Sequence, residues 1–389
     1  MKIAVISPTF PPDHCGIGDY SARVVEEFLN RNEQVSVWSC QKNPQANYLT
    51  SNNFKYFYTP RPWGPVTFCS FLIELKKFSP EAVIVQYIPY LFAKKWGIHP
   101  LLPFWILILR FILYLLNPSI SLLLIVHESN YPVRFDLKGI CLGLPQWFQF
   151  VFIFLICPKI SFTFESAYKK YKNFFFWKWL YLIPVGANIK RVQMDWDIPI
   201  DEIVPKEAKI LLHFGGAHPT NLFEYEFAAF DAIFKNLKNT KLVFVGLTQE
   251  KINVLLDQYN FSHLKSAVIG LGYLMEAEVS VWISRSYLVL APFLDGISTR
   301  RTSAMAAFDH GKPLLTTRSW STNSSIAWEE FCFIVPMQEK QKFIEKAVFI
   351  LENSEEAKST GERGKKYYDA HFSYPVITNK ILSIINFKN

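Results

Sequence analysis

Two adjacent arginines stand directly before an Ala- and Met-rich segment with helical character, in the stretch LDGISTRRTSAMAAFDHGKPLLTT. Arg300 and Arg301 can present guanidinium forks, while Thr302 and Ser303 add hydroxyl donors at the positive end of the predicted helix dipole. The segment follows a predicted strand, Leu288–Ala291, and open parallel sheets bind ligands beyond the carboxyl ends of their strands. We therefore expect a diphosphate to bind here. The alternative is a pair of surface arginines that only cap a helix.

A second candidate phosphate site is the glycine-rich segment CGIGDYSARV near the N-terminus. Gly16 and Gly18 lie where a loop meets a helix, so the backbone can approach a phosphate closely and direct N–H groups at it. The string approximates a dinucleotide-binding fingerprint. However, a long loop, SPTFPPDHC, precedes it, and the second strand ends in Ser39, Cys40 and Gln41 without a carboxylate for a ribose. Hydride transfer is therefore disfavoured, and a glycine turn without a ligand remains the alternative.

Short apolar runs that alternate with helical patterns position these residues, which is typical of parallel βαβ units. A helix is expected over Asp19–Asn30, with Asp19 as its N-cap. The expected strands are Ile3–Ser7, Val35–Ser39, Ala82–Gln86 and Leu122–His127, then Ile210–Phe214, Leu242–Gly246, Val268–Gly270, Leu288–Ala291 and Leu314–Thr317.

The chain is long enough for two domains of roughly 150–200 residues each, since it has 389 residues. The polar, proline-punctuated segment IPVGANIKRVQMDWDIPIDEIVP separates the two series of strands, and we interpret it as the inter-domain linker. We place the N-terminal domain at 1–187 and the C-terminal domain at 188–370.

The composition excludes several classes of protein. Half of the residues are apolar, which excludes a disordered chain, collagen and a small disulfide scaffold. Six scattered cysteines without a CxxC pair are typical of reduced thiols in a cytosolic protein and predict no zinc site. The net charge is +8, but it is not gathered in the runs that a nucleic-acid binder would show. The apolar run in MKIAVISPTF is shorter than the apolar region of a signal peptide, so we interpret this segment as a first strand.

Basic residues lie among aromatic residues in the segment KKYKNFFFWK, from Lys169 to Lys178. Such a surface favours an anionic membrane interface, where rings lie among the headgroups and lysines meet lipid phosphates. The alternative is a set of ordinary surface lysines over an aromatic core. Two apolar stretches precede it, Leu101–Leu116, which Arg110 interrupts, and Gln146–Cys157. Both are shorter than the ~20 residues of a membrane span. We expect helices there, either buried or lying in the interface.

The chain resembles the GT-B glycosyltransferases, and among them the large retaining group numbered family 4. PTFPPDHCGIGDYSARVVEEF resembles that family's glycine loop and first helix, and IPVGANI its entry to the second domain. FGGAHPTN resembles the first strand and loop of that domain, and HGKPLLTT a later strand. The resemblance implies an α/β GT-B fold with two Rossmann-like domains that face a cleft. It also implies a C-terminal helix, 371–389, that crosses back to the N-terminal domain.

The resemblance implies a hexosyltransferase that takes a nucleotide-sugar donor on its C-terminal domain and a glycan or lipid-linked acceptor on its N-terminal domain. His127, at the end of a strand, matches the histidine that contacts the transferred sugar and is the catalytic candidate; a structural histidine is the alternative. Asp19, Glu128 and Glu165 are candidates for contact with sugar hydroxyls or the acceptor. The donor-binding candidates are Gly16, Gly18, Gly215, Arg300, Arg301, Thr302 and Ser303.

The chain departs from the wider family at two positions that commonly carry glutamates, which are Ser298 and Ala306 here. The loop GGAHPTN also lacks the lysine that often binds the diphosphate. The chain resembles the subgroup with an R-R-x-S element, so Arg300, Arg301 and Ser303 take over phosphate binding.

Neither a metal nor a cofactor is expected. Asp195-Trp196-Asp197 has the D-x-D pattern of metal-dependent GT-A transferases, but it lies in the polar linker, and we interpret it as solvated surface. The remaining alternatives are a GT-B epimerase-type enzyme, an inverting transferase and a non-catalytic sugar- or nucleotide-binding subunit. We expect a cytoplasmic protein without nucleic-acid partners, either free or peripheral on the inner face of the plasma membrane.

Overall fold

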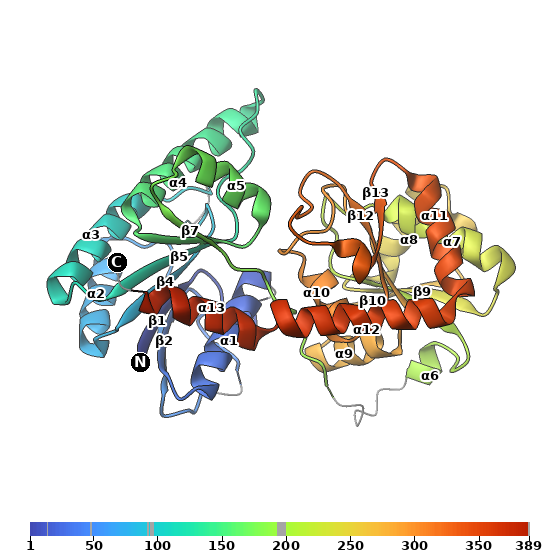
Figure 1. Cartoon of the computed structure of the whole chain (residues 1–389), viewed down its shortest axis with the longest axis horizontal. Coiled ribbons are helices and arrows are strands. Elements are labelled where there is room, and N and C mark those ends of the chain that lie inside the picture. The colour runs from blue at the N-terminus through green and yellow to red at the C-terminus, as the bar shows by residue number, and fades with distance from the viewer. Residues whose placement is uncertain (14, 47–48, 92, 94–96, 193–199, 388–389) are drawn as a thin grey trace. The chain divides into compact units, whose positions relative to one another are not determined.

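The computed structural model describes the chain except for residues 14, 47–48, 92, 94–96, 193–199 and 388–389. The chain forms two compact units (Figure 1). Unit 1 comprises Met1–Pro184 together with Tyr374–Asn389, and unit 2 comprises Val185–Ser373. The sequence predicts boundaries at 187/188 and 370/371, and the units divide at 184/185 and 373/374. Asp195, Trp196 and Asp197 lie outside the described residues.

Unit 1 is built on a seven-stranded sheet in which every pair of neighbouring strands is parallel. The strand order is β3-β2-β1-β4-β5-β6-β7, so the chain reverses its direction across the sheet between β1 and β4. The strands are β1 (Lys2–Ser7), β2 (Gln34–Ser39), β3 (Phe54–Tyr58), β4 (Ala82–Tyr87), β5 (Ser121–Val126), β6 (Lys159–Phe162) and β7 (Trp179–Leu182).

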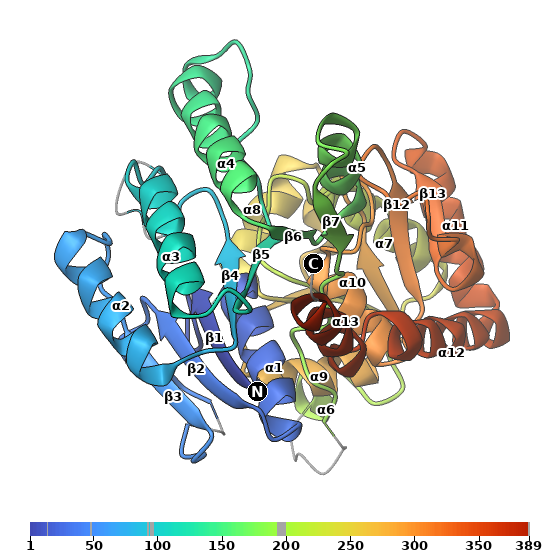
Figure 2. The same ribbon diagram turned by 60° about the vertical axis from the view of Figure 1, so that its left-hand side comes forward.

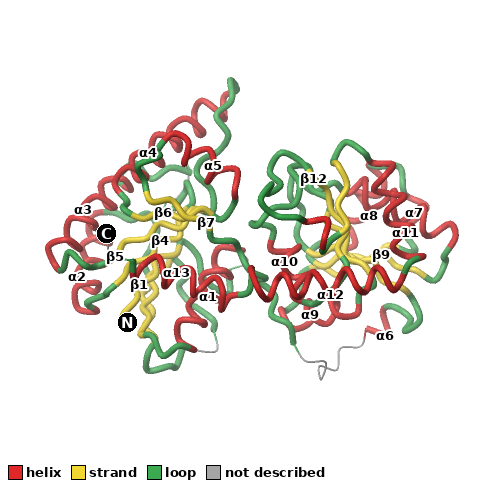
Figure 3. Tube along the Cα trace, in the orientation of Figure 1, coloured by secondary structure: helices red, strands yellow, loops and turns green. Residues whose placement is uncertain are grey.

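Helices cover both faces of this sheet (Figures 2 and 3). The face that carries Ala4, Val83 and Leu124 shares one apolar core with α2, α3, α4 and α5, while α1 and α13 lie together on the other face. The helices are α1 (Gly16–Asn30), α2 (Pro65–Phe78), α3 (Leu102–Leu116), α4 (Leu144–Ile156), α5 (Glu165–Phe174) and α13 (Tyr374–Asn386). The C-terminal helix thus belongs to unit 1.

Unit 2 repeats this plan with six parallel strands in the order β10-β9-β8-β11-β12-β13, and the chain reverses between β8 and β11. The strands are β8 (Lys209–Phe214), β9 (Thr240–Val245), β10 (Val268–Gly272), β11 (Leu288–Ala291), β12 (Leu314–Arg318) and β13 (Phe333–Pro336). The helices are α6 (Ile200–Ile203), α7 (Phe223–Asn236), α8 (Gln249–Gln258), α9 (Glu276–Arg285), α10 (Thr302–Asp309), α11 (Lys340–Glu352) and α12 (Ser354–His371).

The alternation of side chains along β8 shows why both faces of this sheet need helices. Ile210 and Leu212 lie in a core with α9, α10 and α12, whereas Leu211 lies in a second core with α7, α8 and α11. Successive residues of a strand point to opposite faces, so a strand that is apolar throughout must be covered on both sides. The apolar strands therefore dictate a doubly covered parallel sheet.

The structure confirms the nine strands expected from the sequence to within a few residues, and it adds β3, β6, β7 and β13. The helix expected to begin at Asp19 begins at Gly16 instead, with Cys15 as its N-cap. The expectation of an Asp19 N-cap is therefore wrong, because the Asp19 amide already donates a helical hydrogen bond to the Cys15 carbonyl.

Candidate functional site

The carboxyl end of β8 in unit 2 continues into a glycine pair at the point where the strand order reverses. Gly215 has a φ of +137°, which favours glycine, and its amide donates to the Val245 carbonyl at 2.9 Å. A Cβ on Gly216 would meet no heavy atom within 4 Å. Ligands of open α/β sheets bind at such reversal points. The backbone of this loop is therefore exposed where a ligand is expected.

The segment after β11, on the other side of the reversal point, supplies a buried carboxylate. Asp295 is 1% exposed and accepts hydrogen bonds from both arginines, with Arg300 Nη2 at 2.8 Å from Oδ2 and Arg301 Nη2 bonded to Oδ1. Asp295 was not a candidate in the sequence. The cluster carries two guanidinium charges and one carboxylate charge, so its field remains positive.

Arg301 is held from several sides. Its Nη2 donates to Thr220 Oγ1 at 3.0 Å, and its guanidinium carbon lies 4.2 Å from the centre of the Phe293 ring. The side chain is only 12% exposed, and burial lowers its pKa, although a guanidinium stays charged. Its Nε donor is buried without a hydrogen-bond partner among the described residues. Because so much of the side chain is fixed, a ligand anion would meet a cation that is already positioned.

Backbone and side-chain contacts fix the loop that carries these arginines. Phe293 N donates to Thr317 Oγ1 at 2.8 Å, and Thr299 N donates to Asn323 Oδ1 at 2.9 Å. Gly296 has a φ of +82°, and a Cβ there would lie 2.4 Å from Ser319 N. The two hydrogen bonds keep the loop in one conformation. This conformation requires glycine at position 296, because a larger side chain would force its neighbours to shift.

Helix α10 begins directly after the arginine pair, as expected. Arg301 is its N-cap, and Thr302 and Ser303, both half-buried, form its first turn. The helix N-terminus, the two guanidinium groups and the Gly215 loop thus all lie at the carboxyl edge of one sheet. His218, from the loop after Gly216, has a pKa lowered by burial and by the Arg301 charge.

The two positions that carry glutamates in the wider family offer no carboxylate here. Ser298 is fully buried, and its hydroxyl has no hydrogen-bond partner among the described residues. Ala306 is fully buried in α10. The carboxylate of Asp295 pairs with both arginines.

In unit 1, His127 directly follows β5, and its amide extends the ladder by donating to the Tyr87 carbonyl at 3.1 Å. The imidazole is 8% exposed, its Nε2 lies 2.8 Å from Gln86 Oε1, and Tyr20 meets its ring edge-on at 5.1 Å between centroids. Burial lowers its pKa to about 3. The ring is therefore neutral near pH 7. With Gln86 Oε1 as acceptor, Nε2 carries the proton and Nδ1 is the acceptor.

The two N-terminal glycines have different environments in α1. A Cβ on Gly18 would lie 3.1 Å from Thr9 Oγ1 and 3.2 Å from Phe10 N, so this glycine permits close packing of the helix on the preceding loop. Gly16 is exposed, and a Cβ there would meet nothing within 4 Å. Close packing explains Gly18, whereas the protein's own packing does not require a glycine at position 16.

The three acidic candidates of unit 1 lie in different places. Asp19 is half-buried in the first turn of α1. Glu128 is exposed after His127, and its charge contributes to the raised pKa of Tyr90. Glu165, the first residue of α5, is buried and pairs with Lys169 at 2.7 Å. That ion pair gives Glu165 a structural partner. Among the described residues, no group of three or more acidic, histidine or cysteine side chains could hold a metal ion.

Comparison with known proteins identifies the fold. No protein-family profile matches the chain. No curated protein sequence matches it either. Among solved structures, sucrose-phosphate synthase from Thermosynechococcus elongatus matches with a TM-score of 0.72 at 16% identity, covering 98% of both chains. HepE from Anabaena, in complex with UDP, matches with a TM-score of 0.67 at 12% identity, over 98% of this chain and 99% of that one.

A third solved structure is WaaG, a glycosyltransferase involved in lipopolysaccharide biosynthesis. It matches with a TM-score of 0.65 at 14% identity, over 99% of this chain and all of its own. Sequence identities this low show likeness of fold alone. Two parallel-sheet α/β units and near-complete coverage by such neighbours establish that the chain has the GT-B fold.

Proposed function

We propose that this protein is a glycosyltransferase that takes a nucleotide-diphosphate sugar as its donor. The observation that carries the proposal is the arginine pair at the strand reversal of unit 2. Arg300 and Arg301 are held on buried Asp295 beside the glycine loop of β8 and the start of α10. All three elements present positive charge or N–H donors, which a diphosphate requires.

The same arrangement supports catalysis as well as binding. When the sugar leaves, negative charge builds on the phosphate oxygen of the departing nucleoside diphosphate. A cation that is already held in place stabilises this charge without having to reorganise during the reaction. Arg301, with contacts to Asp295, Thr220 and Phe293, is such a cation. Positive charge from the chain itself is the basis for proposing transfer that needs no metal.

The names of the solved neighbours support a nucleotide-sugar donor. HepE was solved with UDP and with UDP-glucose, and WaaG is called a glycosyltransferase. UDP and UDP-glucose are therefore the first ligands to test. The motifs that resemble family 4 support retention of configuration, with same-face attack and the leaving phosphate acting as the base. They also support a glycan or lipid-linked acceptor.

His127 is proposed to contact the transferred sugar. A neutral imidazole whose Nε2 bonds to Gln86 presents Nδ1 as an acceptor for a sugar hydroxyl. In this role His127 binds and orients the sugar and does not carry a proton in the reaction.

Calorimetric titration of UDP into Arg301→Ala tests the donor site. Loss of charge-assisted hydrogen bonds is expected to weaken binding about 10- to 100-fold. Arg285→Ala is the matched control, because Arg285 precedes β11 and so lies at the opposite edge of the same sheet. If folded Arg301→Ala and Arg300→Ala both bind nucleoside diphosphates with unchanged affinity, the phosphate assignment is wrong.

A non-catalytic nucleotide-binding subunit is the second candidate, because Ser298 and Ala306 leave no carboxylate where the wider family commonly has two glutamates. Turnover separates the two functions. Hydrolysis or transfer of a nucleotide sugar that disappears in Arg301→Ala supports the enzyme. Tight nucleotide binding without turnover of any donor supports the binding subunit.

A further inference from the structure

Helix α4 has both of its polar side chains buried, and the side chains that it exposes are apolar. Gln146 and Gln149 are buried, and their Nε2 atoms donate to the carbonyls of Gly97 and Pro89 at 2.7 and 2.8 Å. The exposed side chains recur at helical spacing and are Leu144, Phe148, Phe152 and Leu155. The surface helix of a soluble protein has the reverse pattern. The outward face of α4 is therefore suited to an apolar surrounding.

Helix α3 lies beside α4 (Figures 1 and 2). The side chains that α3 exposes are also mostly apolar. Its one charged residue, Arg110, donates to the carbonyl of Ile156 at the end of α4, where a cation also meets the negative end of the helix dipole. The exposed apolar side chains of α3 are Phe104, Leu107, Ile108, Phe111, Tyr114, Leu115 and Leu116. Together with the exposed residues of α4 they form what we call the α3–α4 face.

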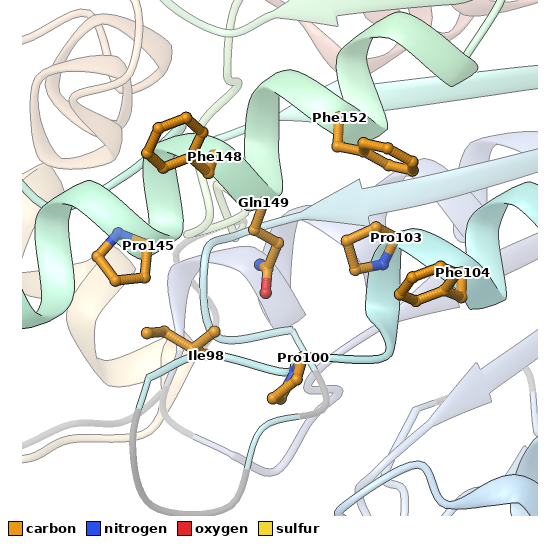
Figure 4. Close-up of a pocket in the computed structure, with 8 residues that line it drawn as sticks. All are labelled: Ile98, Pro100, Pro103, Phe104, Pro145, Phe148, Gln149 and Phe152. Carbon is orange, nitrogen blue, oxygen red and sulfur yellow. The ribbon is translucent and has the colours of Figure 1, made fainter.

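A pocket of about 270 Å³ opens between the N-terminal parts of the two helices (Figure 4). Pro103 and Phe104 come from α3, and Phe148 and Phe152 from α4, while Gln149 is the single polar side chain of the lining. The α3–α4 face thus includes an apolar hollow. Contiguous apolar surface of this kind is rare on a protein that is surrounded only by water.

The segment Gly139–Ile156, which consists of a π-helical turn and α4, is long and apolar enough to cross a membrane. However, 44% of it is buried inside the unit, and Phe150, Ile153 and Phe154 are fully buried in the core. A spanning helix would have to leave that core. The geometry therefore supports a helix that lies along a membrane surface, with one face on the protein and the other in the lipid.

The charge of the same region complements an anionic surface. Residues 101–179 contain eight lysines and arginines but only three acidic residues. Lys169, Lys170 and Lys172 of α5 are exposed. Lys178 Nζ donates to the carbonyls of Leu155 and Cys157, which places the basic-aromatic segment at the C-terminal end of α4. Phe174, Phe176, Trp177 and Trp179 are exposed around it. Aromatic rings and cations at the rim of an apolar surface are typical of the lipid headgroup region.

We propose that the α3–α4 face docks unit 1 on a bilayer that contains anionic lipids. The apolar side chains enter the boundary between headgroups and acyl chains, and the lysines of α5 meet lipid phosphates. This inference goes beyond glycosyl transfer and does not depend on it, because it rests on residues outside the candidate donor site.

Co-sedimentation of the full chain with phosphatidylcholine vesicles, with and without phosphatidylglycerol, tests the proposal. We expect binding that is stronger with phosphatidylglycerol and falls with added salt. Phe148→Glu combined with Phe152→Glu is expected to lower the partition coefficient at least about tenfold. Leu237→Glu combined with Val254→Glu replaces two exposed apolar residues of unit 2 and is expected to leave binding unchanged.

Thermal melting of each variant shows whether it folds. Lys170→Glu combined with Lys172→Glu is a second variant, which changes no residue of α3 or α4. This second variant should lose the preference for anionic vesicles. The proposal is overturned if no vesicle binds the wild-type chain, or if folded Phe148→Glu/Phe152→Glu binds as well as the wild type. One such outcome is a wild-type chain that binds no vesicle but forms a dimer, which Phe148→Glu/Phe152→Glu abolishes. The α3–α4 face would then be an interface between two copies of the chain.

Discussion

At the residue scale, the chemistry of His127 follows from its burial in a layer of rings and amides. Gln86 occupies Nε2 and Tyr20 meets the ring edge, so a proton added to the ring would be buried with little water to solvate it. This is the physical cause of the pKa near 3. A histidine of ordinary exposure would titrate near neutral pH, and its role could change with pH. His127 has the same charge throughout that range.

The burial of His127 has a consequence for acid stability. The unfolded chain binds a proton at His127 below the ordinary pKa of 6.5, whereas the folded chain resists it down to about 3. Between these values the unfolded state holds more protons, so stability falls as pH falls, by about 1.4 kcal/mol per pH unit at most. His127→Gln should flatten this part of the curve of unfolding free energy against pH, measured by urea titration. Replacement of exposed His371 by Gln is the control, and equal slopes in wild type and His127→Gln would contradict the prediction.

The two glycines of the N-terminal loop form a matched pair for substitution. Gly18→Ala places a methyl group 3.2 Å from Phe10 N, so the backbone there must shift by a few tenths of an ångström, whereas Gly16→Ala meets open space. Both changes gain helix propensity of up to about 1 kcal/mol, but only Gly18→Ala adds overpacking of about 1–3 kcal/mol. Thermal unfolding should therefore rank Gly18→Ala below Gly16→Ala. The reverse order would show that the loop carrying Thr9 and Phe10 yields without cost.

At the element scale, the parts that could be predicted from the sequence are those with a strong local signal. Strands β4 and β5 are mostly apolar and completely buried, so their composition identifies them as strands that are covered on both faces. The edge strand β3 was missed because only Phe54 is buried and the rest of FKYFY is partly or fully exposed. Strand β6 begins with a lysine, Lys159, that looks like surface but is buried.

In the candidate site, too, some residues could be predicted from the sequence and others could not. Arg300, Arg301 and the start of α10 could be found because a strand, a loop and a helix follow one another in the sequence. Asp295 could not, because its role depends on a loop conformation in which Gly296 has a φ of +82° and the chain turns the carboxylate back on both guanidinium groups. The signal in the sequence was an acidic residue four positions after the last residue of β11.

Lys159 connects two elements that are distant in the sequence. Its Nζ, on β6, lies 2.9 Å from the Ile384 carbonyl, 2.7 Å from the Phe387 carbonyl and 2.9 Å from Ser121 Oγ. It thus caps the C-terminal end of α13 with a buried cation. Lys159→Met should destabilise the protein by about 1–3 kcal/mol and increase amide exchange in the last turn of α13. Lys55→Met, at an exposed lysine on β3, is the control; unchanged exchange in Lys159→Met would exclude the capping role.

At the scale of the whole molecule, the chain leaves unit 1 after β7, builds unit 2 and returns to unit 1 as α13. Helix α13 packs against α1 and β5, with Ile377 and Ile381 fully buried. The ring centroid of Tyr374, at its start, lies 6.0 Å from that of Tyr20, which in turn lies 5.1 Å from that of His127. The last helix of the chain is therefore part of the environment of the candidate sugar-binding histidine.

Deletion of residues 374–389 should accordingly affect the two units unequally. Each fully buried isoleucine of α13 contributes roughly 1.5–3 kcal/mol, so unit 1 loses much of its stability, and hydrogen exchange should rise in α1 and β5. Water that reaches Tyr20 should move the pKa of His127 up toward its ordinary value, which a pH titration of the imidazole resonance would detect. The arginine pair and Asp295 belong entirely to unit 2, so UDP binding should persist with the affinity of the full chain. Loss of UDP binding together with the protection of α1 would mean that the donor site depends on unit 1 and is not built by unit 2 alone.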